Sequence, residues 1–201
     1  MKSLLMRIPG RCARFAAAVL ALATAGLAHA ETVDFALSDD AFRFGLSGPL
    51  SRIIGGAQGQ YDVGYLQHRD DGEDSYAVHA GFLVTGDAGL RDLDLTVGAG
   101  LRGVYVGGDG DDGGAIAPGV KFDARLPGYE RVGLTGYAYY APSVVSFGDV
   151  DGYRDLGVAL SYELNRNAAI YVGLRNVRFG AEHGGDVTLD TGLYGGLGLT
   201  F

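Results

Sequence analysis

Hydrophobic and polar residues alternate along most of the chain, and no stretch keeps its apolar residues at the three- and four-residue spacing of a helix. The clearest alternating runs span residues 76–84, 93–105, 120–126, 156–162 and 187–201. Shorter or less regular runs span residues 42–47, 58–67, 132–140 and 168–179. In the last of these the alternation slips near Arg175, which predicts a β-bulge there. The pattern therefore predicts an all-β, antiparallel fold.

Two all-β architectures produce this pattern. A soluble sandwich or lipocalin-like barrel turns its apolar face inward, whereas a transmembrane barrel turns that face toward lipid and its polar face toward the lumen. Several runs reach eleven residues or more, and a membrane-spanning strand needs about 9–11 residues. The polar faces are rich in glycine and charge, including Lys121, Asp123 and Arg125, which suits a narrow, side-chain-filled lumen. The sequence therefore favours a transmembrane β-barrel.

The connections between runs set the expected strand count. Short links at residues 87–91, 127–131 and 165–168 alternate with longer or more polar links at 68–75, 107–114, 142–152 and 180–186. This alternation is typical of short periplasmic turns and longer external loops. Counting back from Phe201 gives nine strands to residue 42, and because bacterial barrels have even counts, residues 32–37 are predicted to form a tenth, turning at Ser38, Asp39 and Asp40. Eight strands, with the N-terminal stretch peripheral or lumenal, is the alternative.

Residues 1–30 have the organisation of a secretory signal peptide. Four basic residues and no acidic one precede an apolar core at residues 15–27, and the triplet Ala28-His29-Ala30 has the A-x-A form of a cleavage site. We therefore expect a signal peptide at 1–30, with Ala28 and Ala30 as its cleavage positions, and one barrel domain at 31–201 in the bacterial outer membrane. Cys12 would leave with the signal, so the mature chain has no disulfide or thiol chemistry.

The net charge of the mature chain limits the classes of partner that the protein is expected to bind. Beyond residue 30 the chain keeps 24 acidic and 12 basic residues, a net charge of −12. Nucleic-acid binding needs clustered positive charge, so no nucleic-acid partner is expected. The expected partners are outer-membrane lipid and lipopolysaccharide. The acidic stretches at 70–74 and 107–114 lack the spacing of a calcium loop, so no metal site or cofactor is predicted beyond weak divalent cations at these loops.

Ten residues on the polar faces are predicted to form a network of ion pairs that fills the lumen, because barrels of eight to ten strands leave room for side chains rather than an open channel. These candidates are Arg43, Asp62, His79, Arg102, Lys121, Asp123, Arg125, Tyr139, Asp155 and Arg175. The network predicts a structural or surface-interaction protein. A narrow passive pore for small solutes is the alternative, since such a pore needs no motif.

A barrel enzyme acting on lipid A or surface peptides is the second alternative. The mature chain offers only His68, His79 and His183 as bases near neutral pH. Neither G-x-S-x-G nor His-x-Ser occurs in the sequence. The sequence therefore identifies no catalytic residues.

Three segments together resemble the YfaZ family of bacterial outer-membrane proteins: Gly136-Tyr-Ala-Tyr-Tyr-Ala-Pro-Ser143, Tyr153-Arg-Asp-Leu-Gly157 and Ile170-Tyr-Val-Gly-Leu-Arg175. The resemblance covers most of the mature region and is weakest before residue 58. It implies an outer-membrane barrel and supplies no substrate or catalytic residues. Phe201, which ends the last alternating run, resembles the C-terminal signature of outer-membrane barrels and implies recognition by the barrel-assembly machinery.

Overall fold

The computed structural model describes residues 31–201 except 71–72, 92, 109–110 and 182–184. The predicted cleavage positions Ala28 and Ala30, and His183, lie outside the described residues. The strands are β1 Thr32–Leu37, β2 Ala41–Pro49, β3 Gln60–Asp70, β4 Glu73–Asp87, β5 Asp94–Gly108, β6 Asp111–Leu126, β7 Tyr129–Ala141, β8 Ser146–Gly148, β9 Val150–Asn165, β10 Ala168–Ala181 and β11 Gly185–Thr200. Two short 3-10 turns, Leu50–Arg52 and Ser143–Val145, lie in connections. None of the described helices is long and apolar enough to cross a membrane.

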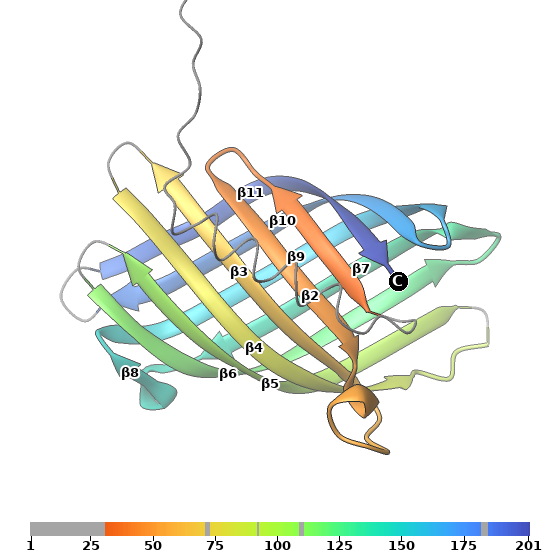
Figure 1. Ribbon diagram of the computed structural model, residues 1–201, viewed down its shortest axis with the longest axis horizontal. Coiled ribbons are helices and arrows are strands. Elements are labelled where there is room, and N and C mark those ends of the chain that lie inside the picture. The colour runs from red at the N-terminus through yellow and green to blue at the C-terminus, as the bar shows by residue number, and fades with distance from the viewer. Residues whose placement is uncertain (1–30, 71–72, 92, 109–110, 182–184) are drawn as a thin grey trace, which may run out of the picture.

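Ten of these strands close into an antiparallel barrel (Figure 1). Their order around the barrel is β5-β4-β3-β2-β1-β11-β10-β9-β7-β6, and β6 pairs with β5 to complete the ring. The three-residue β8 pairs with residues 113–115 of β6, beyond the part of β6 that pairs with β7. The prediction of ten strands is confirmed. Residues 32–37 form the tenth strand, β1, which pairs with β11 on one side and with β2 on the other. The turn at residues 38–40 connects β1 to β2.

The two ends of the barrel are distinguished by the chain termini. Thr32 pairs with Thr200 at one end, which we call the proximal end and which also carries the tight turns at 127–128 and 166–167. The opposite end, which we call the distal end, carries β8, the turn at 38–40, the end of β3 and the start of β4. In Figure 1 the distal end lies at the left and the C-terminus at the right.

The outer surface carries an apolar belt. Its members are exposed, outward-facing hydrophobic side chains from the barrel strands other than β2, and they include Phe35, Val63, Phe82, Val97, Leu101, Val120, Phe122, Leu134, Val158, Leu160, Ile170, Val172, Leu174, Leu193 and Leu197. Exposed apolar surface on this scale is not tolerated in water, and it is the lipid-facing surface of a transmembrane barrel. The soluble sandwich is therefore excluded and the transmembrane architecture is confirmed.

Two details of the sequence-based prediction are wrong. The links at 68–75 and 107–114 are mostly strand, because β3 continues to Asp70, β4 begins at Glu73, β5 ends at Gly108 and β6 begins at Asp111. The face from Val187 to Phe201 is also interrupted, because Val177 pairs with Asp190 and Arg178 with Thr188, which leaves Leu189 as an extra residue of β11. The bulge therefore lies near Arg175 as predicted but on the facing strand β11, opposite Val177 and Arg178, and it turns the buried Leu189 inward.

Candidate functional site in the barrel lumen

Two carboxylates, one arginine and one histidine from four strands meet in the middle of the lumen and form what we call the charged layer. Arg102 on β5 donates to Asp155 on β9 and to Asp62 on β3, each over 2.8 Å. His79 Nε2 on β4 lies 3.1 Å from the same oxygen of Asp62. No two of β3, β5 and β9 are neighbours in the barrel, so Arg102 ties separate parts of the wall together. Its removal would leave buried carboxylates unpaired, which is strongly destabilising.

Tyrosines enclose this charged layer. The Arg102 guanidinium lies 3.5 Å from the centroid of the Tyr139 ring, within cation–π range. Arg43 donates to the Tyr137 hydroxyl over 3.0 Å, and its Nη1 lies 3.9 Å from Asp155 Oδ2. The tyrosines thus contact both arginines, Tyr139 through the face of its ring and Tyr137 through its hydroxyl group.

A second pair of charges lies on the opposite wall. Arg175 on β10 forms an ion pair with Asp190 on β11, and both side chains are almost completely buried. The Arg175 guanidinium lies 4.7 Å from the centroid of the Tyr194 ring. Nearby, the Tyr171 hydroxyl donates to Asp34 over 2.6 Å. This pair extends the polar lining of the lumen around its circumference.

A cavity of about 400 Å³ occupies the proximal half of the lumen. Its lining reaches the proximal rim at Arg166 and Thr200, and we call it the vestibule. Arg125 bonds to Glu163 over 2.6 Å and lies 3.3 Å from Asp123, and these side chains are about one-third exposed. Lys121 Nζ donates to Gln60 over 3.0 Å. The polar side chains of the vestibule are therefore more exposed to solvent than those of the charged layer, which lies next to it on the distal side.

The ten predicted lumen residues all lie inside the barrel. Eight of them line the vestibule or the charged layer that closes it: Arg43, Asp62, Arg102, Lys121, Asp123, Arg125, Tyr139 and Arg175. His79 and Asp155 bond to members of that set. The structure does not join all ten into one network, because Lys121 bonds to Gln60 and Arg175 to Asp190 instead. The sequence reading missed the partners Asp34, Gln60, Tyr137, Glu163 and Asp190.

Glycines on the inner face make room for the large inward side chains. A Cβ added at Gly119 would overlap the Tyr139 ring, and one added at Gly157 would lie 2.6 Å from the Tyr137 ring. Each glycine is in register with the aromatic residue that it faces. The polar faces of the sequence are thus rich in glycine because the lumen of a ten-stranded barrel is too narrow for a side chain opposite each inward ring.

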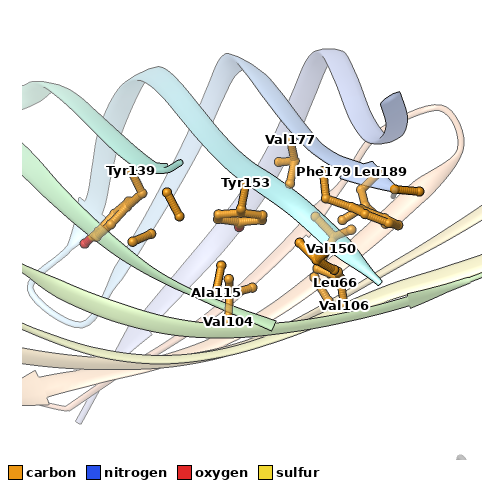
Figure 2. Close-up of a cluster of buried hydrophobic side chains, with 14 of the residues drawn as sticks. Leu66, Val104, Val106, Ala115, Tyr139, Val150, Tyr153, Val177, Phe179 and Leu189 are labelled. Atoms are coloured by element: carbon orange, nitrogen blue, oxygen red, sulfur yellow. The ribbon is translucent and has the colours of Figure 1, made fainter. Parts of the chain in front are cut away.

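The distal half of the lumen is filled by apolar side chains, which we call the apolar layer. Its buried members are Leu66, Ala77, Val104, Val106, Ala115, Ala117, Ala141, Val150, Tyr153, Val177, Phe179, Ala181 and Leu189, and the same cluster continues to Leu83 and Tyr139 in the vestibule lining. Figure 2 shows Tyr153, Val177 and Phe179 reaching inward from one side of the wall and Val104 and Ala115 from the other. The described interior therefore changes from polar at the proximal end to apolar at the distal end.

Sequence reasoning missed the apolar layer because it assigned one character to each face of a run. On β10 the inward positions Arg175, Val177 and Phe179 keep the phase of the alternation, but they change from charged to apolar. The outward position Arg178 changes in the opposite sense. A reversal of polarity within an unbroken alternating run is the signal that would have found this layer.

The His79 site holds no nucleophile among the described residues, and towards the distal end His68 on β3 and the buried Ser75 on β4 are register partners. His79 is buried, and within the described residues it contacts the Asp62 carboxylate without any hydroxyl bonded to it. A nucleophile beside the base is what such catalysis needs. The described residues also contain no group of three or more histidines, cysteines and carboxylates placed to hold a metal ion.

Comparison with protein families identifies the chain. A family model described as "YfaZ precursor" matches residues 13–201. The chain belongs to the YfaZ family. The resemblance found in the sequence is confirmed, and the word "precursor" agrees with a cleaved N-terminal signal. No curated protein matches the chain.

Solved structures similar to the chain include two porins and an outer membrane phospholipase. An anion-selective porin from Comamonas acidovorans is 12% identical with a TM-score of 0.38, covering 85% of this chain and 59% of the porin, so this YfaZ-family chain spans less than two thirds of that protein. Outer membrane phospholipase A from Escherichia coli is 11% identical with a TM-score of 0.41, covering 86% of this chain and 95% of that one. A further porin is 12% identical with a TM-score of 0.28, covering 89% and 64%.

Proposed function

We propose that this YfaZ-family protein is a bacterial outer-membrane barrel with a closed lumen, acting as a structural or surface-interaction protein and not as a general pore. The apolar layer carries this proposal. It fills the distal half of the lumen directly beyond the charged layer. An ion on this route would have to part the Arg102 ion pairs and then leave water among apolar side chains, and moving a charge out of water is very costly.

The orientation follows from where the apolar belt lies along the strands. On β9 and β10 the belt begins at the proximal turn, with Tyr162, Leu164 and Ile170 exposed beside it. At the distal end the same strands continue past the belt into polar outward positions such as Arg154 and Asn176. Outer-membrane barrels have short periplasmic turns and longer external segments. The proximal end, with the vestibule, then faces the periplasm, and the distal end faces the outside.

Electrical recording in planar bilayers tests the closed lumen. Purified mature protein is expected to show no steady open-channel conductance. The double variant Tyr153→Ala with Phe179→Ala removes two rings from the apolar layer and is expected to give a small, flickering conductance. The double variant Tyr140→Ala with Leu193→Ala removes similar volume from the outer surface, where both residues are exposed, and is expected to stay silent. Steady conductance of the wild-type protein would contradict the proposal and favour the narrow pore.

A further inference from the structure

Two arginines lie side by side on the outer wall of the distal half. Arg154 on β9 and Arg178 on β10 are direct partners in the register, and both point away from the lumen. Like charges placed directly opposite each other on a sheet repel and destabilise the pair. No carboxylate of the described residues lies within 4.0 Å of either guanidinium. The wall therefore carries a concentrated positive charge that the described protein does not neutralise.

Polar groups beside the arginines are already aligned around this pair. Arg154 donates to the side-chain oxygen of Asn176 over 2.8 Å, and Asn176 donates to the Thr191 hydroxyl over 2.6 Å. The Nε atom of Arg178 has no hydrogen-bond partner among the described groups and is shielded from solvent. The arrangement thus holds one arginine in place and leaves the other with a free donor.

The depth of the pair is fixed by its neighbours. On the proximal side the next outward row holds Leu156, Asn176 and Thr191, and the row after it holds Val158, Leu174 and Leu193 of the apolar belt. On β7, Tyr140 is the register partner of Arg154 and is 60% exposed. Tyrosines on a barrel wall mark the level of the lipid headgroups. Arg154 and Arg178 therefore lie at headgroup depth, at the distal edge of the apolar belt.

We propose that Arg154 and Arg178, with Asn176 and Thr191, bind a phosphate group of a phosphorylated glycolipid headgroup, the chemistry of lipopolysaccharide. A phosphate placed between the two guanidiniums removes their repulsion and accepts charge-assisted hydrogen bonds from them. The acyl chains of the same lipid lie along the belt residues below. The inference rests on the proposed outer-membrane placement with the distal end outward.

Titration of the folded mature protein in detergent tests the site, with native mass spectrometry reporting bound lipid. The probes are bisphosphorylated lipid A, dephosphorylated lipid A and inorganic phosphate. Wild-type protein is expected to prefer the bisphosphorylated form by about thirtyfold, taking about fivefold for each arginine at a headgroup surface. Arg154→Gln with Arg178→Gln is expected to lose this preference, and Arg178→Gln alone to lose about fivefold.

Arg69→Gln is the matched control, because Arg69 is another outward arginine of the distal half but has a carboxylate partner, with its Nε 3.9 Å from Asp74 Oδ1. It is expected to keep the wild-type preference. The proposal fails if wild-type protein binds the two lipid forms equally, a result that needs no variant to fold. It also fails if the double variant keeps the preference. Displacement of the lipid by equimolar inorganic phosphate would identify a free-phosphate site instead. None of these outcomes depends on conductance, which tests the closed lumen separately.

Discussion

The proximal and distal halves of this barrel are built from the same strands with opposite polarity. In the proximal half the outward positions are apolar, as at Leu174 and Leu193, and the inward positions are charged, as at Lys121 and Arg125. In the distal half the inward positions are apolar, as at Val177 and Phe179, and outward positions such as Arg178 are polar. One half has the pattern of a membrane barrel, and the other has the pattern of a soluble one.

This difference shows which solvent each half meets. Apolar side chains turn away from water wherever the wall is surrounded by it, and toward hydrocarbon where lipid surrounds it. The strands of fifteen or sixteen residues, β4, β5, β6, β9 and β11, exceed the roughly 9–11 residues that span a membrane. Their extra length forms the distal half, which has a core of its own. In the proposed function, that core closes the lumen.

The largest effect is expected in this distal core. Phe179→Ala removes a ring that is 1% exposed and is expected to lower the free energy of unfolding by about 3–5 kcal/mol. Unfolding in urea, followed by far-UV circular dichroism of protein in lipid vesicles, measures it. Tyr140→Ala, an outward ring of similar size, is the control and is expected to cost less than about 1 kcal/mol. Equal losses for the two variants would show that the distal interior is not a packed core.

The sequence predicted the parts of this molecule that depend on a single repeating pattern. The ten strands, the turn at Ser38, Asp39 and Asp40, and the inward placement of residues such as Arg102 and Asp155 follow from alternation, which fixes the face of each side chain. The contacts between those residues could not be predicted. Arg102 meets Asp155 because the barrel closes β6 onto β5, and that closure brings β9 near β5 without any local signal in the sequence.

The apolar layer and the strand that carries the bulge at Leu189 were missed for a related reason. A one-residue insertion in β11 is visible only against the register of β10. Where a strand passes from lipid into water, its outward positions change from apolar to polar and its inward positions from polar to apolar, while the two-residue alternation continues. Reading each run as uniform therefore assigned Val187 and Leu189 to the lipid face, although they pack with the distal core.

The next effect compares one substitution at two depths of the same strand. Leu193→Arg places a charge on the apolar belt, where its exposed fraction is 65%, and is expected to cost about 2–4 kcal/mol at mid-membrane depth. Thr188→Arg places the same charge on the exposed distal wall of β11, directly opposite Arg178, and is expected to cost about 1 kcal/mol through repulsion between the two arginines. Heat-dependent gel mobility and recovery in the membrane fraction measure both. If the two variants are equally impaired, the lipid boundary between the halves is misplaced.

The smallest effect on stability is expected at the proximal tip. Phe201 is 38% exposed, and its backbone N–H donates to the carbonyl of Glu31 over 2.9 Å. Deleting it removes one hydrogen bond and little packing, so the unfolding free energy should fall by about 1 kcal/mol or less. If Phe201 is also the signal for the barrel-assembly machinery, the same deletion should markedly reduce the protein recovered in the outer membrane of cells. Refolding of the deletion variant into vesicles in vitro, where no machinery is present, is the control and should match the wild type. If the deletion slows both refolding in vesicles and assembly in cells, Phe201 contributes to folding and is not a signal. If assembly in cells is unchanged, Phe201 is neither an assembly signal nor needed for folding.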